Sequence, residues 1–225
     1  MPQYFNSTLL ALGFACLSFC FVLADDKAPD TASALDRLNV GIDQGKTPKS
    51  RADKSLNFDF ETGILEDWTA TGDAFAGQPI QGDKVSARRQ DMRSEHQGEY
   101  WIGTFEKLGD TSTGTLTSPP FVVEGPFASF LIGGGSDNTI RVELVDMQTD
   151  KVIHRATGRS TENMRQVVVD LSSHKGKELV VRMVDEGRAG WGHLNFDCFD
   201  CIRINPDLYP NQKYNSYMMT ILSKV

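Results

Sequence analysis

The feature that most constrains the fold is a succession of short strand-like runs between Leu56 and Asn205. These runs are rich in β-branched and aromatic residues, as in "TIRVELVD", "QVVVDL" and "ELVVRMVD", and Gly, Asp, Ser or Pro separate them at nearly regular spacing. No stretch of this region has sustained helical periodicity. Many short strands joined by frequent turns predict an all-β domain, an antiparallel β-sandwich.

The first 24 residues predict export. They contain no charged side chain, and an apolar run from about Leu9 to Leu23 ends just before Asp25. Small or short residues before the acidic pair suit signal peptidase, so we expect cleavage after Ala24. Because the apolar run is short for a bilayer span, we expect a secreted or extracytoplasmic protein with no membrane span after cleavage. An uncleaved anchor is the alternative.

Composition divides the remainder of the chain into three parts. Residues 25–55 are rich in Asp, Lys, Ala, Ser and Pro and have few large apolar side chains, which predicts a flexible linker. Residues 56–205 form the predicted sandwich. Residues 206–225 differ again, with two prolines and three tyrosines before a short apolar run. The sequence leaves open whether this tail packs on the sandwich.

Charge and cysteine content exclude two classes. The net charge of −7 leaves no electrostatic footprint for nucleic acid. Cys16 and Cys20 would leave with the leader, so Cys198 and Cys201 alone cannot form a disulfide scaffold. In an unbroken strand these two residues would point to opposite faces about 10 Å apart. A bulge or turn after Asp197 would bring them closer, and a structural disulfide or two unpaired thiols are favoured over redox chemistry or zinc.

Motifs for catalysis are missing from the sequence. It contains no G-x-S-x-G and no H-E-x-x-H, and its four histidines lie on separate segments without metal-ligand spacing. The glycine-rich "LIGGGSDN" lacks dinucleotide-binding spacing and predicts a tight turn. Carboxylates are plentiful, but no pair stands out as the two that a glycosidase needs. We therefore expect a protein that is not an enzyme.

Polar residues on predicted strand faces are the candidates for ligand binding. Arg141 and Glu143 alternate with apolar residues, so both should point to one side of their strand. They could pair only with each other, or they could offer a donor and an acceptor to neighbouring sugar hydroxyls. Asp185, Trp191 and His193 offer similar groups, and a tryptophan ring can also stack on a sugar.

The two ends of the domain suggest a metal site. "NFDFETG" near the beginning and "NFD" near the end would lie together if the terminal strands are neighbours. Asp59, Glu61 and Asp197 would then converge, and Ca²⁺ accepts such carboxylates together with backbone carbonyls. Ordinary edge-strand charges that discourage aggregation are the alternative.

Several segments, taken in order, resemble a known family. They are "FETGILEDWTATGDAF", "GTLTSPPF", "SFLIGGGSDNTIRVELVD", "RATG" and "VDEGRAGWGHLNFD". Together they resemble the family 66 carbohydrate-binding module, which accompanies levanases and other family 32 glycoside hydrolases. The resemblance implies a jelly-roll sandwich of the galactose-binding-like kind, without catalytic activity, that recognises terminal fructosyl units of fructans beside a structural metal. It also implies that Arg141, Glu143, Asp185, Trp191 and His193 include sugar contacts.

Two departures from the family matter. Cys198 stands where the family usually has a second aspartate, which puts calcium in doubt. We also expect the module to stand alone behind a leader, whereas the family's modules accompany a glycosidase domain. We therefore expect a secreted, non-catalytic carbohydrate-binding module. A protein-interaction or structural module of the envelope, with an envelope protein as partner, is the alternative, and a small glycoside hydrolase is a third possibility.

Overall fold

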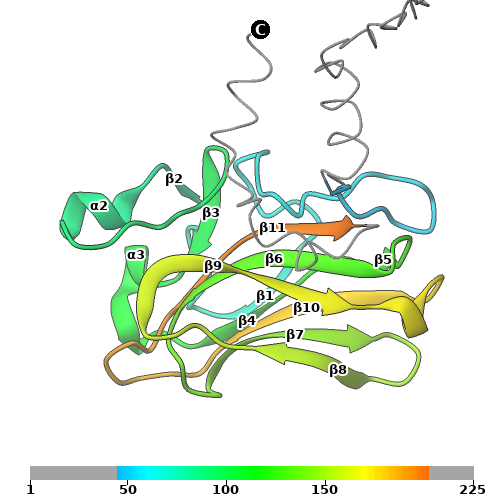
Figure 1. The fold of residues 1–225 in the computed structure, drawn as a ribbon. Helices are drawn as coiled ribbons and strands as arrows, with labels where there is room; N and C mark the ends of the chain where they lie inside the picture. The colour runs from blue at the N-terminus through cyan, green and yellow to red at the C-terminus, as the bar shows by residue number, and fades with distance from the viewer. Residues whose placement is uncertain (1–44, 203–225) are drawn as a thin grey trace, which may run out of the picture. The chain divides into compact units, whose positions relative to one another are not determined.

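The protein is an antiparallel β-sandwich, as the strand pattern predicts. The structure is a computed structural model that describes residues 45–202. One sheet is six-stranded and the other five-stranded, and every strand pair is antiparallel (Figure 1). The six-stranded sheet has the order β1 (Thr69–Gly72), β4 (Gly114–Thr117), β10 (Glu178–Asp185), β7 (Ile140–Asp146) and β8 (Lys151–Ala156), with β5 (Phe121–Val122) also paired to β10. The five-stranded sheet has the order β2 (Ile80–Gln81), β3 (Tyr100–Gly103), β11 (Leu194–Ile202), β6 (Phe127–Gly134) and β9 (Thr161–Asp170).

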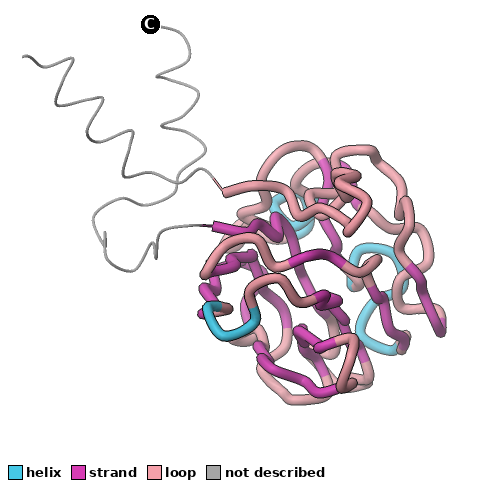
Figure 2. Tube along the Cα trace, turned by 90° about the vertical axis from the view of Figure 1, so that its right-hand side faces the viewer, coloured by secondary structure: helices cyan, strands magenta, loops and turns pink. Residues whose placement is uncertain are grey.

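The chain crosses repeatedly from one sheet to the other. It passes from β6 to β7, from β8 to β9, from β9 to β10 and from β10 to β11, each time changing sheet. Helical segments are short, and strands and loops make up the rest of the described chain (Figure 2). The helical segments are α2 (Lys84–Arg88), α3 (Phe105–Leu108), η1 (Gly109–Thr111) and η2 (Ser172–His174). This alternation places the inner faces of both sheets against one shared core.

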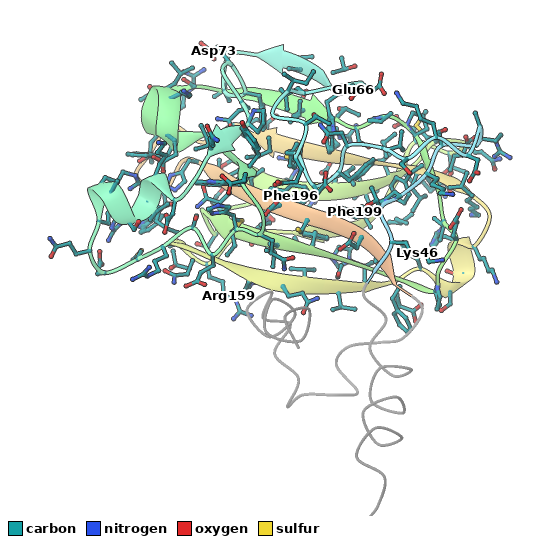
Figure 3. The ribbon with its side chains drawn as sticks, turned by 90° about the horizontal axis from the view of Figure 1, so that it is seen from above. Lys46, Glu66, Asp73, Arg159, Phe196 and Phe199 are labelled. Carbon is teal, nitrogen blue, oxygen red and sulfur yellow. The ribbon has the colours of Figure 1, made fainter. Side chains whose placement is uncertain are left out.

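Aromatic residues fill the core. Phe196 and Phe199 of β11 point between the sheets, where Phe130 of β6 packs against both at centroid distances of 5.5 and 6.0 Å (Figure 3). Phe58 and Trp68, from the segment before β1, close the same cluster. Each buried phenylalanine contributes about 2–3 kcal/mol by leaving water. Trp68 is thus part of the core, as is usual for a tryptophan in a sandwich.

A β-bulge interrupts the last strand at the two-cysteine motif. The pairing of β11 with β6 shifts between Asp197 and Asp200, and Cys198 has a φ of 50°. The extra residue puts both Phe196 and Phe199 in the core, three positions apart, where a regular strand would alternate every second residue. Cys198 is a free cysteine. The side chain of Cys201 lies outside the described part of the structure.

The ordered domain begins before the predicted boundary at Leu56. Lys49 and Ser55 form an isolated β-bridge, and the backbone N–H of Val122 donates to the carbonyl of Lys49 at 2.9 Å. These backbone bonds attach residues 45–55 to strand β5, so this part of the predicted linker belongs to the domain. The predicted leader, the rest of the linker and the predicted tail after residue 205 lie outside the described residues. No helix within residues 45–202 is long and apolar enough to cross a membrane.

Candidate functional site

A row of polar side chains crosses the outer face of the six-stranded sheet. Thr69 of β1 lies opposite Thr117 of β4, which lies opposite Arg182 of β10. Arg182 in turn faces Glu143 of β7, and Glu143 faces Arg155 of β8. Residues that are opposite each other in antiparallel strands point to the same face. Five strands at about 4.8 Å spacing give this arginine–threonine row a length of about 19 Å.

Glu143 is the anchor of the row. Its side chain is only 1% exposed, and its two oxygens accept five hydrogen bonds from Arg141, Arg155 and Arg182, at 2.8 to 3.1 Å. Burial alone would raise the pKa of Glu143, but the bonds from the three arginines outweigh it and lower the pKa to about 2. The side chain is therefore ionised at neutral pH, and both of its oxygens are already engaged.

The arginines keep donors that point away from this anchor. Arg155 and Arg182 each use Nε and Nη2 on Glu143, and within residues 45–202 their Nη1 groups have no hydrogen-bond partner. Their side chains are 48% and 34% exposed. Arg141 is more enclosed and uses its Nη1 on Glu186 at 3.0 Å and on the carbonyl of Asn138 at 2.9 Å. The face thus offers fixed, charged donors, whereas Glu143 has no acceptor left for a ligand.

A second polar cluster surrounds His193, just before β11. Its Nδ1 lies 2.6 Å from Oδ1 of Asp110, and its Nε2 lies 3.3 Å from Oε2 of Glu162. Burial lowers the pKa of His193, but the two carboxylates more than offset this and raise it. Arg88 of α2 completes the network with a 2.7 Å bond to Glu162. This cluster is a nearly closed set of ion pairs that fastens α2 and η1 to the end of the sheet.

Asp185 lies beside this cluster in an unusual environment. It is buried at the end of β10, where Oδ2 accepts a 2.6 Å hydrogen bond from Oγ1 of Thr104 and Oδ1 has no partner among the described residues. Burial, the largest effect, raises the pKa of Asp185 to about 6. A fraction of this carboxyl group therefore stays protonated near neutral pH.

Trp191 is held by its neighbours. The residue has a positive φ of 65°, its ring centroid is 5.5 Å from that of His193, and the guanidinium of Arg89 lies 5.5 Å from the ring. These contacts bring Trp191 together with His193 at the loop before β11. Trp101, by contrast, is fully buried under the segment that covers the five-stranded sheet.

The five predicted ligand residues therefore fall into two groups. Arg141 and Glu143 lie on the outer face of the six-stranded sheet, while Asp185, Trp191 and His193 lie around the loop that leads into β11. The sequence pattern did not single out Arg155, whose pairing with Glu143 depends on the register between β7 and β8. Asp110 and Glu162 were also missed, since they are distant in sequence from His193 and carry no motif.

The acidic residues predicted to hold calcium are mainly bonded to backbone amides. Glu61 accepts hydrogen bonds from the N–H groups of Glu99 and Tyr100 at 2.9 and 3.0 Å. Asp197 is fully buried, and Oδ2 accepts from the N–H of Gln97 at 2.8 Å. These two carboxylates thus tie the loop before β3 to the two ends of the domain.

The same acidic residues influence each other electrostatically. Burial raises the pKa of Asp197, and the negative charges of Glu61 and Asp59 raise it further. Glu61 and Asp59 are thus close enough to Asp197 to affect its pKa. Nevertheless, across the described chain no group of three or more His, Cys, Asp or Glu residues is arranged to hold a metal ion. Calcium binding by Asp59, Glu61 and Asp197 therefore stays a prediction from the sequence.

Comparisons with known proteins give one curated relative and several solved structures. No protein-family model matches the chain. A protein of Aspergillus rugulosus named "Putative glycosyl hydrolase ecdE" is 32% identical over 163 residues, which are 66% of this chain and 22% of that protein. The chain thus spans about a fifth of the length of this relative.

Two of the solved structures that resemble the chain are a carbohydrate-binding module and an adhesin domain. The carbohydrate-binding module TmCBM61, in complex with β-1,4-galactotriose, is 18% identical with a TM-score of 0.44 and covers 70% of this chain and 97% of its own. The K1 cleaved adhesin domain of Lys-gingipain from Porphyromonas gingivalis is 15% identical with a TM-score of 0.41 and covers 65% of this chain and 96% of its own.

Proposed function

We propose that this protein is a non-catalytic carbohydrate-binding module whose glycan contacts lie on the outer face of the six-stranded sheet. The observation that carries the proposal is the arginine–threonine row. Its guanidinium groups are fixed by one buried carboxylate, and threonine hydroxyls continue the row over two further strands. Fixed donors and hydroxyls on an open face are what an extended, hydroxyl-rich chain requires.

The curated relative supports the same proposal. Its name describes a glycosyl hydrolase, and this chain corresponds to about a fifth of its length. A segment of that size suits an accessory module that raises the effective concentration of a catalytic domain at its substrate. The resemblance of the "FLIGGG" and "GWGHLNFD" segments to family 66 modules supports it independently.

For the glycan, the resemblance favours terminal fructosyl units of fructans. Titration calorimetry of the purified protein against levan and inulin oligosaccharides tests this specificity. Saturable binding with a Kd between about 1 µM and 1 mM supports it, a range equivalent to about 4–8 kcal/mol. A glycan array run in parallel separates the two levels of the proposal. Binding to other glycans alone would reject fructan and keep the module, whereas no binding to any glycan would reject the module.

The position of the contacts is tested by variants. Arg182→Gln removes a charged donor from the row, and Arg155→Gln does the same on the opposite side of Glu143. Both should weaken glycan binding about tenfold, since each loses one charge-assisted hydrogen bond. The matched control is Arg93→Gln, because Arg93 is exposed in the segment between α2 and β3 of the other sheet and has no ion pair with any residue from 45 to 202. Equal effects of all three variants would contradict the proposed face.

A glycoside hydrolase is the second candidate, favoured by one specific observation. The pKa of Asp185 is raised to about 6 and the residue lies beside His193, and a carboxyl group with a raised pKa is suited to general acid catalysis. The name of the curated relative points the same way. Release of reducing sugar from a polysaccharide panel, abolished in Asp185→Asn, would establish this function. Absence of turnover by the intact protein would exclude it.

A further inference from the structure

We propose that the outer face of the six-stranded sheet binds acidic polysaccharides, whose carboxylate or sulfate groups contact Arg155 and Arg182. This inference rests on the proposed function and narrows its ligand class. It is an alternative to the fructan specificity on this face, because fructans are neutral and have no group that forms a charge pair with an arginine. Three features of the face support it: its local charge, its lack of aromatic rings and the direction of its unused donors.

The local charge of the row is opposite to that of the protein. The whole chain carries −7, yet Arg141, Arg155 and Arg182 gather around the single buried carboxylate of Glu143. Even with Glu186 counted against Arg141, the group keeps one positive charge in excess. A positive group on an acidic protein attracts an anion locally while the remaining surface repels general polyanions.

The described strands that form this face carry no exposed aromatic ring on which a sugar could stack. Within the described strands of the six-stranded sheet the only Phe, Tyr or Trp is Phe121, and its side chain is buried in the core. Sites for neutral sugars use such rings to cover the apolar side of the pyranose or furanose. Without them, the binding free energy on this face must come mainly from charged hydrogen bonds, which an anionic sugar exploits best.

The unused donors are preorganised on either side of β7. Arg155 and Arg182 lie on the strands that flank β7, so their backbones are about 10 Å apart at 4.8 Å per strand. Both guanidinium groups converge on Glu143 and are held there through Nε and Nη2, which leaves the two Nη1 groups for a ligand. Because Glu143 already orders the guanidinium groups of both arginines, binding of a carboxylate or sulfate costs these side chains little further conformational entropy.

The threonines define how a polysaccharide would continue. Beyond Arg182 the row passes to Thr117 and Thr69, whose hydroxyls can exchange hydrogen bonds with neutral sugar hydroxyls. A parallel pair, Thr71 and Thr115, lies one step along the strands, with its hydroxyls 2.7 Å apart. An acidic residue at the arginines and a hydroxyl-rich neighbour over the threonines therefore match the chemistry of the face.

The test compares ligands that differ only in charge. Calorimetry of the intact protein is run with oligogalacturonate and with the same oligomer after reduction of its carboxyl groups. We expect the acidic oligomer to bind about tenfold or more tightly, and this preference to shrink at ~0.5 M salt because an exposed charge pair is screened. A sulfated oligomer forms a third arm, and its rank against oligogalacturonate identifies which anion the arginines prefer.

Variants locate the preference. Arg155→Gln and Arg182→Gln should bring the acidic oligomer down to the affinity of the neutral one, whereas Arg93→Gln should leave the preference unchanged. Arg182→Lys keeps the positive charge but loses the planar guanidinium group with its paired donors. This variant should retain part of the preference for the acidic oligomer. A urea midpoint for each variant shows that it is folded at the titration temperature.

The outcomes separate the two proposals. Equal affinity for acidic and neutral oligomers overturns this inference and leaves the carbohydrate-binding module intact. No binding to any glycan overturns both. Polyphosphate is titrated as a further ligand, and binding as tight as that of the acidic oligomer also overturns the inference, since it would show attraction to any anion without recognition of a sugar.

Discussion

Replacing Glu143 with Gln should destabilise the protein by about 2 kcal/mol at pH 7. The side chain keeps its shape but loses the charge that holds three arginines together. The pKa of Glu143 falls from 4.5 in the unfolded chain to about 2 in the fold, a difference equivalent to about 3 kcal/mol. Because Arg155 and Arg182 are 48% and 34% exposed and can be rehydrated, solvent screening reduces this to about 2 kcal/mol.

Urea unfolding measures this loss. With a slope of about 2 kcal/mol/M, the midpoint should fall by about 1 M while the slope stays constant. The effect should also depend on pH. A depressed carboxylate pKa stabilises the fold above pH 4.5, and this contribution disappears as the pH falls through about 2. The difference between the two proteins should therefore be full from pH 5 to 7 and should shrink steadily below pH 4.5.

Glu186→Gln is the matched control. Among the described residues Glu186 pairs only with Arg141, and its side chain is 56% exposed, so its replacement should change stability by less than about 1 kcal/mol. If Glu143→Gln were as stable as the unaltered protein at pH 7, or if its deficit did not change down to pH 2, the anchoring role of Glu143 would be refuted.

The remaining predictions concern the second cluster, a turn and the acidic residues. Asp185→Asn should stabilise the protein by about 1–3 kcal/mol at pH 7 and have no effect near pH 3. The reason is that the pKa of Asp185 is 3.8 in the unfolded chain and about 6 when the carboxyl is buried in the fold. Urea midpoints of both proteins at the two pH values measure this difference. Gly134→Ala should lower the free energy of unfolding by about 3 kcal/mol or more, since a Cβ there would lie 2.2 Å from the carbonyl oxygen of His193. Gly176→Ala, with a similar φ but open space around the Cβ, should lower it by only about 1–2 kcal/mol. An equal fall in Tm for both variants would contradict the steric argument. Calcium is tested by the Tm with and without ~1 mM Ca²⁺: a rise that Asp197→Asn abolishes would establish the metal site, and an unchanged Tm would contradict the prediction.

The sheets were predictable because strand periodicity depends on local sequence. "TIRVEL" alternates between polar and apolar residues, and "ELVVRMVD" is rich in valine, which favours strands. The structure places Val142, Leu144, Val181 and Met183 in the core. The bulge at Cys198 was only one of several alternatives, because it depends on the aromatic core drawing in Phe199. The beginning of the domain was placed too late, since residues 45–55 are attached by backbone bonds that no side-chain pattern announces.

The candidate site was predictable only in part. Alternation correctly placed Arg141 and Glu143 on one face. It could not show that Arg155 and Arg182 would converge on the same carboxylate, since this depends on the register of three strands. Burial also changed the expected role of Glu143 from a sugar acceptor to an anchor for the arginines. The order of residues along the chain likewise did not show that Asp185 lies away from this face, beside His193.

A glycan bound to this protein should contact the outer face of the six-stranded sheet. The most direct measurement is a titration of the isotope-labelled protein with an oligosaccharide that binds, followed by backbone amide chemical shifts. We expect the largest shift changes on β4, β8 and β10, at Thr117, Arg155 and Arg182. Changes confined to the loop before β11, around Trp191 and His193, would contradict it and place the glycan at the other cluster.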